Sequence, residues 1–235
     1  MNILAMDTSN QVLGVALLND NQLVGKVVTN IKRNHSVRLM PAIDQLMRDV
    51  NITPDQLDKI VVAKGPGSYT GVRIGLATAK SMAWALDIPV VGVSSLKVLA
   101  YQGRFFNSYV CPFFDARRGL VFTGLYRWNN SELELVDEEK NTLMENWLQE
   151  LPTKNKEVVF LSPDIELHQE TIQKYMGERA VIPNSHDHMA DPGHLALIGL
   201  NQGPDVTHTL IPNYLRLAEA EAKWISAQKE EQKNG

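Results

Sequence analysis

The stretch DTSNQ at residues 7–11 groups side chains that can hold a metal-bound phosphate. Asp7 offers a carboxylate, and Thr8 and Ser9 offer hydroxyls, which suits a magnesium–phosphate contact. The same residue types also bond their own backbone in tight turns, and a turn is favoured when nothing else is known.

The stretch DARRG at 115–119 sets a carboxylate beside two guanidinium groups. Asp115, Arg117 and Arg118 fit an anion site or a surface ion pair in a hairpin equally well.

A glycine-rich run, GPGSYTG at 65–71, leads into a segment that is apolar nearly all round. Gly65 and Gly67 indicate a positive φ or a close approach, and a helix beginning near Thr70 offers free amide groups and a positive dipole end. The only nearby lysine, Lys64, precedes the glycines, so this is not a P-loop, and the glycine spacing does not match a dinucleotide-binding motif. A structural turn and a phosphate contact remain equal alternatives.

Three of the six histidines lie close together in HDHMADPGH at 186–194. A metal site there is conceivable, but no helical H-x-x-x-H pair occurs, and Asp191-Pro192 has the pattern of a helix N-cap followed by proline. We therefore expect no metal site in this chain. Cys111 lies in an apolar run and is expected in the core.

Apolar periodicity predicts the elements that must position these residues. The first half has the order βββαβαβα, with strands at 2–6, 12–18, 22–29, 60–63 and 89–93 and helices at 35–50, from about 70 to 86, and at 94–101. The same order returns in strands at 109–115, 119–126, 132–136, 158–161 and 180–183 and helices at 142–151, 165–176 and 190–201.

Two halves with one topology indicate a duplicated α/β unit. We expect a first subdomain at 1–103, a second at 104–217 and a charged helical or frayed tail at 218–235. Asp7 and Asp115 each end the first strand of a half. Because ligands of open α/β sheets sit outside the carboxyl ends of strands, both carboxylates are expected to face a central cleft.

Composition limits the classes of function. The chain has 235 residues, a formal net charge of −4 and a single cysteine. An acidic balance argues against unaided binding of nucleic acid, and one cysteine excludes an internal disulfide framework. No signal peptide or membrane span is visible in the sequence, so a cytoplasmic, soluble protein is expected.

Five stretches together resemble the TsaB family, also called YeaZ: ILAMDTSNQVLGVAL, NHSVRLMPAIDQLM, GPGSYTGVRIGLATAKSMAWALDIPVVGVSSL, FFDARRG and PNYLR. The resemblance spans nearly the whole chain and implies the actin-like ATPase (ASKHA, ribonuclease H-like) fold. It also implies a role in making threonylcarbamoyladenosine at position 37, beside the anticodon, of tRNAs that read codons starting with A. The implied role is that of a non-catalytic scaffold, which binds the catalytic paralogue TsaD and the ATPase TsaE and meets tRNA only indirectly.

Two departures from the catalytic pattern support a non-catalytic chain. The paralogue holds a metal with two histidines four residues apart, whereas here His35 is followed at that spacing by Leu39. The phosphate loop D-x-G-x-T of actin-like kinases is replaced by DARRG. We expect no cofactor bound by the chain alone, although ATP or ADP and a divalent metal could bind in the complex. At most a partial or vestigial nucleotide site is expected, from Asp7, Thr8, Ser9, Gly65, Gly67, Asp115, Arg117 and Arg118. The alternative is an actin-fold enzyme in its own right, a phosphotransferase or a glycoprotease-type metallopeptidase.

The resemblance also implies pairing through the helices at 35–50 and 70–86, with TsaD or with a second copy of this chain as competing partners. The predicted contact residues are Leu39, Ile43, Leu46, Arg73, Leu76, Ala77 and Lys80. On this prediction, Leu76→Asp would leave the monomer intact and break the pairing.

Overall fold

A computed structural model describes residues 1–31, 34–130, 132–153 and 156–215. The first of its two five-stranded sheets has the order β3-β2-β1-β4-β5. Its strands are β1 (Asn2–Asp7), β2 (Val12–Asn19), β3 (Gln22–Asn30), β4 (Lys59–Ala63) and β5 (Val90–Val93). The helices between and after them are α1 (Leu39–Asp49), α2 (Tyr69–Leu86) and α3 (Ser95–Ala100).

The second sheet repeats this arrangement in the order β10-β9-β6-β7-β8. It contains β6 (Tyr109–Asp115), β7 (Leu120–Asn129), β8 (Glu132–Leu143), β9 (Val158–Leu161) and β10 (Ala180–Val181), with helices α4 (Met144–Glu150), α5 (Ile165–Met176) and α6 (Pro192–Leu200). In both halves the first three strands are antiparallel and the fourth is parallel to the first. The predicted duplication is confirmed.

Some predicted boundaries are wrong. The strand expected at 132–136 runs on to Leu143, because its polar residues lie half-buried along a sheet edge where no clean alternation marks them. The helix expected from residue 35 begins with a short 3-10 turn at His35–Val37 and becomes α-helical only at Leu39.

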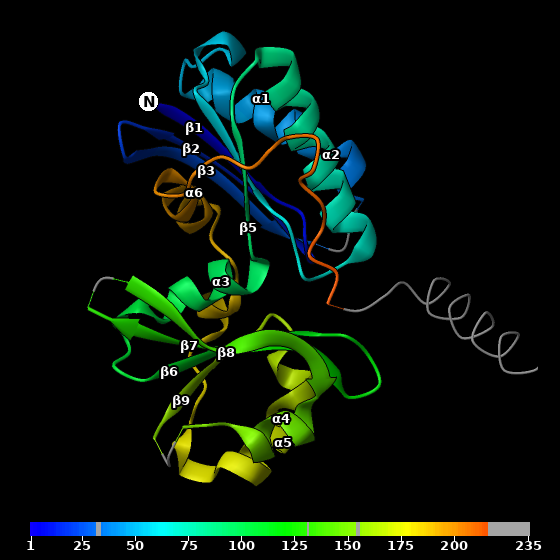
Figure 1. Cartoon of the computed structure of the whole chain (residues 1–235), viewed down its shortest axis with the longest axis vertical. Helices are drawn as coiled ribbons and strands as arrows, with labels where there is room; N and C mark the ends of the chain where they lie inside the picture. Colours follow the sequence, from blue (N-terminus) through cyan, green and yellow to red (C-terminus); the bar gives the residue numbers. More distant parts are fainter. Residues whose placement is uncertain (32–33, 131, 154–155, 216–235) are drawn as a thin grey trace, which may run out of the picture.

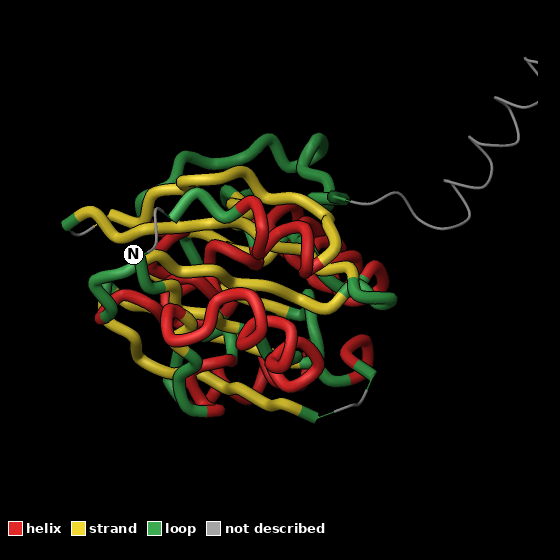
Figure 2. Tube along the Cα trace, turned by 90° about the horizontal axis from the view of Figure 1, so that it is seen from below, coloured by secondary structure: helices red, strands yellow, loops and turns green. Residues whose placement is uncertain are grey.

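Alternating strand residues create two cores on each sheet. In the first sheet, Leu4 and Met6 face α1 and α2, whereas Ile3 and Ala5 face α6. The second sheet is covered by α4 and α5 on one side and meets α3 on the other. Helices and strands therefore alternate in layers (Figure 1), and the view along the long axis shows helices packed against the strands (Figure 2).

Two helices pack against the half on the other side of the boundary expected at 103/104. α3 belongs to the first half in sequence but packs on β6 and β7, and α6 belongs to the second half but packs on β1 and β2. The segment 205–214, which we call the C-terminal strap, also returns to the first half: Asp205 bridges to Val90, and Leu210 is buried in the core of the first sheet. The expected tail at 218–235 lies outside the described residues. No helix within the described ranges is long and apolar enough to cross a membrane.

Candidate functional site

The glycine-rich run is packed against the turn formed by residues 7–11. Ser68 caps α2 by accepting a hydrogen bond from the amide of Gly71, and the amide of Ser68 donates to the carbonyl of Ser9 at 2.7 Å. The Thr8 hydroxyl donates to the carbonyl of Gly71, also at 2.7 Å. The N-terminal end of α2 thus bonds directly to the turn after β1.

Glycine is required here by close approach to the chain's own backbone. A Cβ on Gly67 would lie 2.2 Å from the Ser9 carbonyl oxygen, and one on Gly71 would lie 2.1 Å from that of Thr8. Gly65 has a φ of +93° and exchanges hydrogen bonds with Ser95. Of the two alternatives for this run, the structure supports the structural turn.

Asp7 ends β1 as predicted, but its carboxylate is enclosed. The residue is 4% exposed, and one carboxylate oxygen accepts the amide of Ser9 at 2.8 Å. Burial raises the pKa of Asp7. His35 contacts the carbonyl of Asn10 at 2.7 Å, and within the described ranges no three His, Cys, Asp or Glu side chains converge on a possible metal position.

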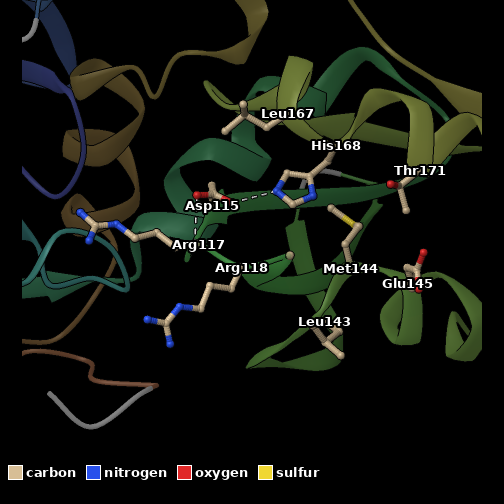
Figure 3. A pocket seen from close by; sticks show the side chains of 10 residues that line it. Asp115, Arg117, Arg118, Leu143, Met144, Glu145, Leu167, His168 and Thr171 are labelled. Carbon is tan, nitrogen blue, oxygen red and sulfur yellow. Dashed lines mark hydrogen bonds and ion pairs between the residues drawn. The ribbon is translucent and has the colours of Figure 1, made fainter. Parts of the chain in front are cut away.

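Asp115 ends β6 and lines a pocket of the second half (Figure 3). One carboxylate oxygen of Asp115 lies 2.9 Å from His168 Nε2. The other accepts a hydrogen bond from the backbone amide of Arg117 at 3.0 Å. The Asp115 amide donates to Asp164 at 3.0 Å, and burial is the main cause that raises the pKa of Asp164. The prediction that Asp7 and Asp115 share one cleft gains no support, because the residues that line this pocket all belong to the second half.

Arg117 and Arg118 form the turn between β6 and β7 in an unusual conformation. Their φ angles are +67° and +57°, a region that costs a non-glycine residue roughly 1–3 kcal/mol. Both are exposed, and the ion pairs of the described residues include neither. Of the two alternatives for DARRG, the surface ion pair is not formed among the described residues: Asp115 contacts His168 of α5 instead. His168 was missed in the sequence, although it lies on the buried stripe of α5 with Ile172 and Met176.

The residues of the histidine-rich stretch at 186–194 each contact a different part of the chain. His188 Nδ1 accepts the amide of Ser162 at 3.1 Å, so its other nitrogen donates to a carbonyl, and burial lowers the pKa of this neutral ring. Asp191 caps α6 through the amide of Gly193, which confirms the predicted N-cap. His194 packs on Tyr101, and burial lowers its pKa to about 4.

Cys111 is fully buried, as predicted. Trp147 Nε1 contacts its sulfur at 3.2 Å, and burial raises the pKa of the thiol to about 11.

The predicted partner face needs correction. Four of its residues face the chain's own core and are at most 4% exposed: Leu39, Ile43, Leu46 and Leu76. They pack on the first sheet, so the rotational phase assumed for both helices is wrong for these residues. The prediction that Leu76→Asp would spare the monomer is wrong for the same reason.

The outward side of α2 carries Arg73, Ala77 and the 74% exposed Trp84. The exposed Val37, in the 3-10 turn before α1, and the exposed Met40 of α1 add to it. We call these five residues the outer helix face. Of the original candidates, Arg73 and Ala77 belong to it.

The C-terminal strap runs beside this face, along α2 (Figure 1). Lys80, half-buried, donates to the carbonyls of His208 and Leu210 of its own chain, at 3.2 and 3.0 Å. Arg73 donates to the Tyr214 hydroxyl at 2.6 Å and lies over the ring of Tyr69. Lys80 therefore holds the strap against α2, and its role as a partner contact stays a prediction.

Two halves that repeat one α/β topology define the actin-like ATPase class of fold. A family model described as "TsaD: tRNA N6-adenosine threonylcarbamoyltransferase" matches residues 21–224. The chain is 49% identical to the tRNA threonylcarbamoyladenosine biosynthesis protein TsaB of Bacillus subtilis, over 97% of this chain and 100% of that one. The Escherichia coli TsaB is 32% identical over 58% of this chain and 62% of its own. The solved structure of YeaZ from Pseudomonas aeruginosa has a TM-score of 0.79 and 26% identity, over 91% of this chain and 99% of that chain. The chain belongs to the TsaB family.

Proposed function

We propose that this chain is a non-catalytic scaffold subunit required to make threonylcarbamoyladenosine at position 37 of tRNAs that read codons starting with A. The observation that carries this proposal is its relation to the TsaB biosynthesis proteins along nearly the whole chain. Its partners are a TsaD-type catalytic paralogue, a TsaE-type ATPase and a second copy of itself. It meets tRNA only through them, because its own balance of charge is acidic.

Three features support a non-catalytic role. The glycine-rich run lies directly against the backbone of Thr8 and Ser9, and the Ser68 amide already donates to the Ser9 carbonyl, so the run serves the chain's own turn. DARRG holds bulky arginines where a phosphate loop needs glycine. His35 has the buried Leu39 in place of a second metal ligand.

The outer helix face is the proposed partner surface. A large exposed tryptophan beside the small Ala77 and the cation Arg73 is a combination found at the centres of protein interfaces. Because one face cannot hold two partners, the homodimer and the heterodimer should exclude each other. Nucleotide and a divalent metal would enter only with the partners.

The experiment is complementation of cells depleted of this protein, with the threonylcarbamoyladenosine content of tRNA measured by mass spectrometry. Asp7→Asn and Asp115→Asn retain the side-chain shape and remove the carboxylate, and a scaffold carrying either change should restore the modification. If Asp7→Asn gives folded protein but no modified tRNA, the enzyme alternative is favoured. If the wild-type chain itself fails to restore the modification, the proposal is wrong.

A further inference from the structure

The end of the C-terminal strap and the start of α2 meet in a stack of three side chains. Arg73 lies over the ring of Tyr69, with its guanidinium carbon 4.0 Å from the ring centroid. Its Nε donates to the Tyr214 hydroxyl at 2.6 Å, and the centroids of the two tyrosine rings are 5.3 Å apart. The rings remain 44% and 41% exposed, so the stack stands on the surface and adjoins the outer helix face, of which Arg73 is a member.

The position of Tyr214 is fixed by the residue before it. The amide of Asn213 donates to the carbonyl of Lys64 at 2.7 Å, and its side chain donates to the carboxylate of Glu139 at 3.0 Å. Glu139 belongs to β8, so the end of the strap is tied to both halves of the chain. Arg73 is therefore oriented before any partner binds, and preorganisation of this kind reduces the entropy that binding costs.

Arg73 still has hydrogen-bonding capacity. In the described part of the chain it donates through Nε alone, and no carboxylate there forms an ion pair with it. Its two terminal amino groups form the planar fork that binds a carboxylate through two parallel hydrogen bonds. Tyrosine rings orient a guanidinium without neutralising its charge. A partner that covers this stack is therefore favoured if it brings a carboxylate.

A second copy of this chain has no available carboxylate to offer at this place. α2 contains no acidic residue. α1 contains Asp44 and Asp49, but Asp44 pairs with Arg48, and Asp49 accepts a hydrogen bond from Gln45. In a symmetric dimer through the outer helix face, the partner surface is the same surface. Each Arg73 would then meet apolar side chains or the second Arg73.

We propose that Arg73 selects the partner of the outer helix face by binding an aspartate or glutamate side chain of that partner, which favours a different protein over a second copy of this chain. The inference rests on the proposed function, in which the TsaD-type paralogue is that protein. Tyr69 and Tyr214 are positioning residues, so the end of the strap belongs to the partner surface. Selectivity arises because the charge is paired in one complex and covered without a partner in the other.

The test follows Arg73→Lys in two equilibria: binding of the full chain to the purified TsaD-type paralogue by calorimetry, and self-association by sedimentation. Lysine keeps the charge and loses the fork. Binding to the paralogue should weaken by about tenfold or more, because a hydrogen bond to a charged group is worth about a decade of affinity. Self-association should not weaken. Arg104→Lys is the matched control, because Arg104 is an exposed arginine 4.4 Å from the ring of Phe105, in the 3-10 turn after α3.

Two further variants test the chemistry of the contact. Tyr214→Phe removes only the hydroxyl that orients Arg73 and should weaken binding to the paralogue by less than Arg73→Lys does. Arg73→Gln removes the charge, so its binding should depend less on ionic strength than that of the wild-type chain.

Three results would overturn the proposal and leave the scaffold role in place. Arg73→Lys binds the paralogue as tightly as Arg104→Lys, it weakens both equilibria equally, or Arg73→Gln keeps the salt dependence of the wild-type chain. If the wild-type chain does not bind the paralogue at all, this proposal and the scaffold role fail together.

Discussion

Replacing Gly71 by alanine should destabilise the protein, because α2 would then have to move away from the turn after β1. The new Cβ would lie 2.1 Å from the Thr8 carbonyl oxygen, a backbone atom that cannot swing aside. Overpacking of this kind costs about 1–3 kcal/mol, and loss of the Thr8–Gly71 hydrogen bond adds about 1 kcal/mol. The better helix propensity of alanine returns at most about 1 kcal/mol. We expect a net loss of about 1–3 kcal/mol in the free energy of unfolding.

Urea denaturation followed by circular dichroism measures this loss. Gly203→Ala is the matched control, because a Cβ there meets nothing within 4 Å and its effect should be within about 0.5 kcal/mol. If Gly71→Ala is as stable as Gly203→Ala, α2 is not closed on the turn. The glycine-rich run would then not be packed against the turn, and this support for a non-catalytic role would be lost.

Three other outcomes are expected. Leu76→Ala should lower the free energy of unfolding by about 2–5 kcal/mol, whereas Trp84→Ala should leave urea denaturation nearly unchanged and weaken pairing with the paralogue in a binding assay. Because burial lowers the pKa of His194 from 6.5 to about 4, the stability that depends on its neutral ring is present above pH 6.5 and is lost as the pH falls toward 4. The loss should approach about 3 kcal/mol, and His194→Gln should flatten the stability profile in that window. Cys111, with a pKa raised to about 11, should react with a thiol reagent only as fast as the protein unfolds.

Strand order, helix order and the duplication could be predicted from the sequence, because each half has clear apolar periodicity and turn residues at its boundaries. The rotation of α2 about its own axis could not be predicted. Small apolar residues such as Gly75 and Ala77 lie on both sides of the helix, so the pattern does not show that Leu76 points inward and Ala77 outward.

The contacts of the site depend on pairs far apart in sequence. Asp115 and His168 are 53 positions apart, and Lys80 meets the C-terminal strap across 128 and 130 positions. No local pattern specifies such pairs. The glycines gave a local signal of close approach, but only the fold shows that the approaching group is the chain's own backbone.

Light scattering on the chain mixed with the purified TsaD-type paralogue tests the scaffold proposal most directly. The wild-type protein should form a one-to-one complex at the expense of its homodimer. Ala77→Asp should stay folded and fail to pair, whereas Gln173→Asp, exposed on α5, should pair normally. If the wild-type chain forms no complex, the proposed scaffold role is contradicted. If Ala77→Asp pairs as well as Gln173→Asp, the outer helix face is not the partner surface.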